Sequence, residues 1–219
     1  MTLKTLQKKY DQLQKKYGDS SLHSIYHGGE DNHPDICFVF MNPTGKNIAS
    51  LPNWDGPYYP WLGTKNIWNL FFQCNLLQGE IYNKIKQYKP KDWNKEFCYQ
   101  VYDNLKENHI FITNLGKCTQ LDARPLKDKD FLEYLPLLEE EIKIIKPKII
   151  ILFGNQVSSL FLNKKISVSE VRKQYIEKKI GNKKYKCFPV FYPVGNGIFN
   201  IDKSIEDIKY IMENYLKGE

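Results

Sequence analysis

Hydrophobic residues recur along the chain in two alternating patterns. Four short apolar runs have the length and the β-branched and aromatic content of buried strands, at 35–41, 109–114, 148–153 and 184–191. Stretches with helical spacing of apolar residues surround them, at 3–17, 66–77, 92–107, 130–146, 155–162 and 202–216. Strands that alternate with helices predict a mainly parallel sheet covered by helices on both faces.

The segments between these elements add detail. Gly181-Asn182, between the strand-like runs 174–180 and 184–191, predicts a β-hairpin. Residues 18–34 show no apolar period and are expected to form a loop. A second loop, over about 42–65, is rich in Gly, Pro and aromatic residues, and its length indicates a functional role in a compact domain.

Two residues mark helix boundaries, and nothing marks a domain boundary. Pro136 predicts a kink or a late helix start, and Asp202 is expected to cap the last helix. The chain has no internal repeat, low-complexity tract or linker. We therefore expect residues 1–219 to form a single three-layer α/β domain, in which 1–34 is an N-terminal helix and loop extension.

Composition sets modest bounds on function. A chain of 219 residues with 42% hydrophobic side chains suits one folded domain. Its net charge of +7 favours a polyanionic partner, although a Lys-rich composition alone has the same effect. Five scattered cysteines with no C-x-x-C pair argue against a disulfide framework or a metal site. Without a signal peptide or a membrane-spanning run, the chain is expected to be cytoplasmic, with no membrane partner.

Candidate chemistry follows the strands. Each of the four buried runs leads into a short polar or glycine-containing segment: Met41–Gly45, Asn114–Cys118, Phe153–Asn155 and Tyr192–Gly197. Ligands of open parallel sheets bind at the carboxyl ends of the strands. These segments are therefore expected to meet at one edge of the sheet.

The order and spacing of the four segments, over about 35–215, resemble the uracil-DNA glycosylase superfamily. Such enzymes flip a nucleotide into a pocket, stack an aromatic ring on the base, read its edge with an Asn and activate a water near the sugar C1′. Met41-Asn42-Pro43 resembles the first motif of the single-strand-selective and mismatch-specific branches. The resemblance implies that Asn42 positions the hydrolytic water. By itself, an Asn-Pro pair followed by Thr-Gly also reads as a turn.

Further segments resemble the thermophile-type branch. Pro60-Trp61-Leu62-Gly63 implies that Trp61 stacks on the base, with Tyr59 in reserve because the surrounding run is aromatic throughout. Asn114 closes a strand and is implied to hydrogen-bond the base edge, since an amide offers a donor and an acceptor in one plane. Lys117 is implied to meet a phosphate.

Two features depart from the family. Tyr192-Pro193-Val194 stands where most branches carry His-Pro-Ser, so Tyr192 is expected to contact the base or sugar as a neutral hydroxyl. Gly195 and Asn196 are expected to contact DNA. Cys118 matches an iron–sulfur ligand of the thermophile-type branch, but the paired N-terminal cysteines are missing, and we expect no cofactor and no metal.

The resulting prediction is a monomeric, monofunctional DNA glycosylase that hydrolyses the N-glycosidic bond of a flipped, damaged or modified base, uracil or a related one. Gly45 is expected to leave room beside C5 of a pyrimidine. Asp55, in the aromatic loop, is either a water-activating carboxylate or a solvated turn residue. Alternatives are a nucleic-acid-binding protein of the same fold without catalysis, and a hydrolase of free nucleosides.

Overall fold

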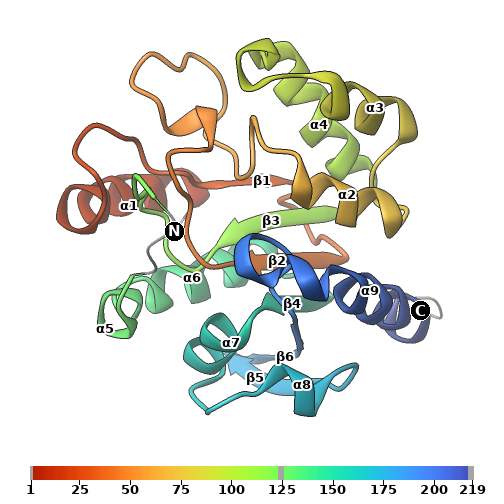
Figure 1. The fold of residues 1–219 in the computed structure, drawn as a ribbon. Coiled ribbons are helices and arrows are strands. Elements are labelled where there is room, and N and C mark those ends of the chain that lie inside the picture. Colours follow the sequence, from red (N-terminus) through yellow and green to blue (C-terminus); the bar gives the residue numbers. More distant parts are fainter. Residues whose placement is uncertain (1, 123–125, 217–219) are drawn as a thin grey trace.

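The computed structural model describes residues 2–122 and 126–216, and a six-stranded sheet lies at its centre (Figure 1). Its strand order is β1-β3-β2-β4-β6-β5. The strands are β1 (His27–Gly29), β2 (Ile36–Phe40), β3 (Ile110–Asn114), β4 (Ile149–Phe153), β5 (Ile176–Ile180) and β6 (Lys183–Val190). The inner strands β3, β2, β4 and β6 are parallel, while β1 and β5 pair antiparallel at the two edges.

Helices cover both faces of this sheet. One face packs against α2 (Asn66–Gln73), α3 (Gly79–Gln87), α4 (Lys95–Glu107) and α9 (Ile201–Tyr215). The other face packs against α1 (Leu3–Tyr17), α6 (Leu135–Ile145) and α7 (Asn155–Leu162). Short helices complete the described chain: α5 (Asp128–Phe131), α8 (Val168–Val171), η1 (Ile48–Ser50), η2 (Pro90–Asp92) and η3 (Gly195–Asn200).

Alternation along the central strands produces the two apolar layers. In β2, Phe38 and Phe40 face the first helix layer, and Cys37 and Val39 face the second. Every residue of β2, β3 and β4 is buried, which explains why these strands read as continuous apolar runs. Phe40 stacks on Phe153 of β4 with ring centroids 4.3 Å apart, so the apolar packing extends to the carboxyl edge of the sheet.

The structure confirms the predicted α/β class, the four parallel strands, the hairpin between β5 and β6, and the bounds of α1 and α7. Pro136 lies in the first turn of α6, where its missing N–H costs nothing, so the late helix start is correct. Asn200, and not Asp202, precedes the first residue of α9.

Besides the short helices η1, η2 and η3, three elements were not anticipated. Residues 18–34 are not all loop, because β1 pairs with β3, but a three-residue His-Gly-Gly strand carries no apolar alternation. The short α3 and α8 were also missed.

The N-terminal α1 buries Leu6 and Tyr10 in the second apolar layer, so it belongs to the core. Across the described helices, none combines the length and apolarity that crossing a membrane requires.

Candidate active site

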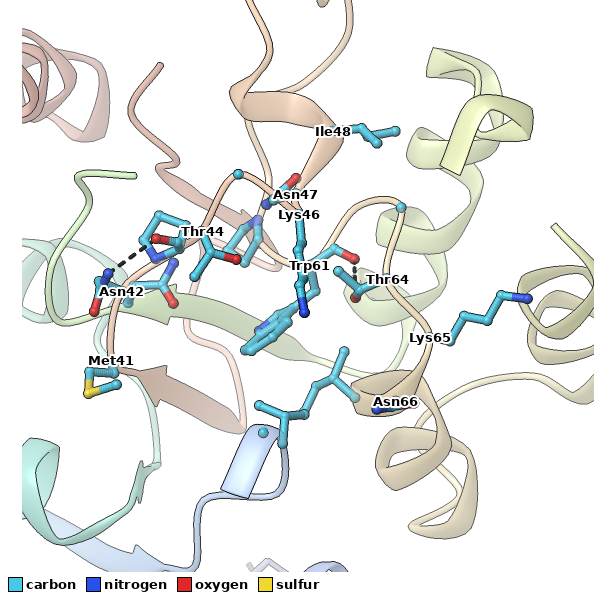
Figure 2. A pocket seen from close by; sticks show the side chains of 18 of the residues that line it. Met41, Asn42, Thr44, Lys46, Asn47, Ile48, Trp61, Thr64, Lys65 and Asn66 are labelled. Carbon is cyan, nitrogen blue, oxygen red and sulfur yellow. Dashed lines mark hydrogen bonds between the residues drawn. The ribbon is translucent and has the colours of Figure 1, made fainter. Parts of the chain in front are cut away.

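A cavity of about 850 Å³ opens at the carboxyl edge of the sheet (Figure 2). It is bordered by the end of β2 and the loop after it, by residues 60–67, by Asn114 at the end of β3, and by the segment after β6. Three of the four predicted segments thus meet in one pocket. The remaining segment, Phe153–Asn155, does not border the pocket. Its Gly154 packs next to Tyr192, which does.

Asn42 presents an unpaired carbonyl oxygen to this region. Its Nδ2 donates to the Pro43 carbonyl over 3.1 Å, which fixes the orientation of the amide. Its Oδ1 is buried and accepts no hydrogen bond from any described residue. A buried acceptor without a partner in the wall of a pocket is suited to a bound water or to a ligand donor.

Asn114 stands beside Asn42 because of the strand register. Phe40 of β2 is opposite Asn114 of β3, and Gly116 N–H donates to the Met41 carbonyl over 2.8 Å, so the pairing continues past both strand ends. The Asn114 side chain is buried, and its Nδ2 lacks an acceptor among the described residues. The pocket therefore holds one unpaired acceptor and one unpaired donor on adjacent strand ends.

Trp61 forms an aromatic wall of the pocket, and its backbone is unusual. Its φ of 65° is in the left-handed region, which disfavours bulky residues by about 1–3 kcal/mol. The Trp61 carbonyl accepts from Thr64 Oγ1 over 2.7 Å, which pins the turn (Figure 2). The indole packs edge-on against Phe40, with centroids 5.0 Å apart. Such fixed strain is typical of a functional position.

Replacing Trp61 by alanine is expected to weaken binding of DNA that carries the target base by roughly 5- to 150-fold, because stacking on an aromatic ring contributes about 1–3 kcal/mol per base. Trp61→Phe, the matched control, keeps a stacking face and should lose much less. Fluorescence anisotropy with a target-base oligonucleotide and with the same oligonucleotide carrying an abasic analogue measures this. Equal losses on both would show that Trp61 does not touch the base.

Tyr192 also lines the pocket. Burial raises the pKa of its hydroxyl more than a hydrogen bond with the Met41 backbone lowers it. The phenol therefore stays protonated and neutral. Gly197 allows η3 to pack against the backbone of Tyr192, since a Cβ at Gly197 would lie 1.9 Å from the Tyr192 carbonyl oxygen. Tyr192 is therefore held where it can donate a hydrogen bond but cannot supply a charge.

Two residues of the aromatic loop are placed elsewhere. The Tyr59 ring packs on Tyr102 of α4 with centroids 4.3 Å apart and does not border the pocket. Of the two aromatic residues predicted to contact the base, the structure places Trp61 in the pocket wall and Tyr59, the reserve, outside it. Asp55 is 75% exposed and pairs with Lys95, as a solvated turn residue does.

Gly45 borders the pocket, but its missing side chain does not create the space. A Cβ at this position would face the Leu121 carbonyl oxygen at 3.3 Å and Leu22 Cδ1 at 3.4 Å, and neither residue lines the pocket. A side chain at position 45 would therefore point away from the pocket, and the prediction that Gly45 makes room beside the base is not supported.

Lys117 is the clearest correction. Its side chain is 1% exposed and its ammonium lies 2.9 Å from Glu141 Oε2, so it is not available to a DNA phosphate. Glu141 was missed, although it occupies an apolar-face position of α6, spaced three residues from Leu138 and four from Ile145. A carboxylate at such a position signals a buried partner. His27 Nδ1 is 2.8 Å from the other Glu141 oxygen.

Opposing effects act on the buried pair. Burial by itself would raise the pKa of Glu141, but Lys117 and His27 hold it below its ordinary value. Burial lowers the pKa of Lys117, against the opposing attraction of Glu141. A buried carboxylate needs such partners, because an uncompensated charge in a protein interior is strongly unfavourable.

The rim of the pocket carries polar and flexible groups. Gly195 is exposed with a φ of 60°, and no atom lies within 4 Å of where its Cβ would be. Asn196 lies in η3, and its side chain is outside the described part of the structure. Lys46, which sequence reasoning also missed, borders the pocket and extends across it near Trp61 (Figure 2). Contact of these residues with DNA remains a prediction.

An iron–sulfur cluster of the thermophile-type branch does not fit these residues. Cys118 is fully buried in the second apolar layer with Tyr10 and Tyr134. The four other cysteines are in or next to β2, α2, α4 and β6, and all five are free. In residues 2–122 and 126–216, no three His, Cys, Asp or Glu side chains gather as metal ligands do.

Fold and pocket together define a three-layer α/β protein with a pocket at the carboxyl ends of its strands, lined by two buried amides and an indole. Residues 29–198 match the family described as the uracil DNA glycosylase superfamily, and the chain belongs to that family. The match covers β2 to β6, the Asn42 and Asn114 strand ends and most of η3.

Two curated relatives are similar over part of the chain. The type-4 uracil-DNA glycosylase of Saccharolobus solfataricus is 33% identical over 94 residues, which are 41% of this chain and 43% of that protein. The type-4 uracil-DNA glycosylase of Sulfurisphaera tokodaii is 29% identical over 116 residues, 50% of this chain and 52% of that protein. The aligned part thus spans about half the length of these relatives.

Proposed function

We propose that this protein is a monofunctional DNA glycosylase, which hydrolyses the N-glycosidic bond of uracil or a related damaged or modified base flipped out of DNA. The observation that carries the proposal is the pair of buried amides, Asn42 and Asn114, which line one pocket with Trp61 and each hold a polar atom without a hydrogen-bond partner among the described residues. The family match and the two type-4 relatives support it.

Each side chain has a role that its geometry suits. Asn42 Oδ1 accepts a hydrogen bond from the attacking water and directs it at C1′ of the sugar. Asn114 Nδ2 donates to an acceptor on the base edge, and Trp61 stacks on the ring. As the bond to the base breaks, negative charge develops on the base, and the neutral Tyr192 hydroxyl donates to the base or sugar.

DNA is the proposed partner, bound by a monomer in the cytoplasm. A chain with a net charge of +7 attracts phosphate. Gly195 and Asn196 lie on η3 beside the pocket, and Phe199 of the same element is 90% exposed. An exposed aromatic ring on the element that borders the pocket is suited to contact the bases around a flipped nucleotide.

A panel of oligonucleotides tests the proposal, each with one uracil, hypoxanthine, xanthine or 5-substituted uracil. We expect alkali-labile sites at one or more of these bases, with the strand intact before alkali. No cleavage of any substrate by excess enzyme would overturn the proposed activity. Strand breaks without alkali would overturn its monofunctional character.

The same panel tests base selectivity. A cavity of about 850 Å³ is larger than a pyrimidine needs, so we expect 5-substituted uracils to be cleaved at rates within roughly tenfold of uracil. Single-turnover rates in one sequence context measure this ratio. A strong preference for plain uracil would show that a side chain closes the pocket when DNA is bound.

A second candidate is a nucleic-acid-binding protein of the same fold without catalysis. It is favoured by the neutral Tyr192 at the end of β6, which provides weaker stabilisation of an anionic base than a cationic group would. This candidate predicts salt-sensitive DNA binding that Asn42→Ala leaves unchanged, with no abasic product.

A further inference from the structure

A buried polar cluster lies directly beneath Asn114, on the side of the sheet away from Trp61. It joins Glu141 of α6, Lys117 after β3, Thr113 of β3 and His27 of β1. Glu141 Oε2 accepts from Lys117 Nζ over 2.9 Å and from Thr113 Oγ1 over 3.0 Å. Its Oε1 lies 2.8 Å from His27 Nδ1. The side chains of Glu141 and Lys117 are 0% and 1% exposed.

The cluster is connected to the pocket through Lys117. The Lys117 ammonium donates to the Asn114 carbonyl over 2.8 Å and also to the Thr113 hydroxyl. It thereby closes the turn that follows Asn114. Leu115 N–H donates to the Phe40 carbonyl over 2.7 Å, so the turn is also tied to the end of β2.

Stability alone does not account for these charges. The surrounding layer is apolar and aromatic, with Tyr10 beneath the ammonium at 5.2 Å and Phe111 stacked on the His27 ring at 5.2 Å. In such a setting, two apolar side chains of similar volume commonly stabilise a fold as well as a buried ion pair does. The ion pair differs from an apolar pair in one respect. The Lys117 ammonium donates to the backbone carbonyl of Asn114 and so restrains its position.

We propose that Glu141 and Lys117 are positioning residues, which fix the backbone of Asn114 so that its side-chain amide meets the base edge. His27 lies beside them, with its Nδ1 2.8 Å from the second oxygen of Glu141. The inference rests on the proposed function for its catalytic consequence, while the ordering of Asn114 stands apart from activity. Neither charged residue touches DNA, since both are buried.

The double variant Lys117→Met/Glu141→Leu tests this inference, since it replaces the ion pair by apolar side chains. We expect a folded protein whose single-turnover rate at saturating enzyme falls roughly tenfold or more, because small displacements of a positioning group have large effects on rate. Affinity for DNA with an abasic analogue should stay within about twofold, since that ligand has no base to read.

Asp207→Asn is the matched control. Asp207 of α9 is also fully buried and pairs with Arg172, but it does not border the pocket. It should lower the melting temperature and leave the single-turnover rate within about twofold of wild type, because that rate is insensitive to the fraction of unfolded protein. A folded double variant with the wild-type rate would overturn the inference.

Two further measurements keep the test decisive. If the double variant does not fold, Glu141→Gln, which retains the shape of the side chain, is used in its place with the same expectations. Independently of activity, the Asn114 side-chain amide signal in a ¹⁵N spectrum, assigned with Asn114→Ser, should shift or broaden in the variant and not in Asp207→Asn. If wild type cleaves nothing, the proposed function is wrong. If the Asn114 amide signal of the variant is the same as that of wild type, the positioning role is wrong.

Discussion

Asn42→Ala is expected to reduce the single-turnover rate of base excision by on the order of 10²- to 10³-fold, with DNA affinity nearly unchanged. The loss follows from the geometry of one amide, whose Nδ2 is committed to the Pro43 carbonyl and whose Oδ1 is free. In the proposed mechanism that acceptor aims the attacking water at C1′, and orientation effects of this size are typical of such groups.

Asn214→Ala is a suitable control, because the Asn214 amide only bonds the Tyr210 carbonyl on the exposed face of α9. Rapid-quench assays with enzyme in excess, together with binding of an uncleavable substrate analogue, separate chemistry from affinity. A parallel loss of both in Asn42→Ala would indicate a binding role instead. An unchanged rate would remove Asn42 from the mechanism.

Replacing Asn114 by alanine is expected to cost on the order of 10²-fold in the rate on the preferred base. The unpaired Nδ2 of this buried side chain is positioned for an acceptor, and each unmet polar group on the base edge costs about 1–3 kcal/mol. Asn114→Asp removes the donor and leaves only acceptors, so its penalty should fall more on a 4-keto base than on a 4-amino base.

Rates on oligonucleotides that differ only in the target base measure this effect. The readout is the ratio between bases, which distinguishes loss of reading from a general loss of folded enzyme. If both Asn114 variants lowered all rates by the same factor, Asn114 would support the pocket without reading the base.

The layered fold was predictable because short, β-branched apolar runs such as 149–153 alternate with helical patterns, as buried parallel strands do. The segments after the strands predicted the pocket, because the carboxyl ends of parallel strands lie along one edge of the sheet. β1 was not predictable in this way, since His27-Gly28-Gly29 is held by pairing with β3 and has no pattern of its own.

Side-chain direction accounts for the remaining differences. Tyr59 and Trp61 look equivalent in an aromatic loop, and only the left-handed backbone at Trp61 and the packing of Tyr59 on α4 separate them. Lys117 resembles a phosphate ligand in sequence, because nothing local reveals that Glu141, 24 residues later, is buried against it. Tertiary contacts, which local patterns do not contain, decided both positions.

The most direct measurement of the central claim is the release of free base from DNA. An oligonucleotide with one target base is incubated with excess enzyme, and the small-molecule fraction and the strand are analysed by mass spectrometry. The account predicts free base and intact abasic strand in equal amounts for wild type, and neither for Asn42→Ala. Bound but unaltered DNA with wild-type enzyme, across all bases of the panel, would contradict it.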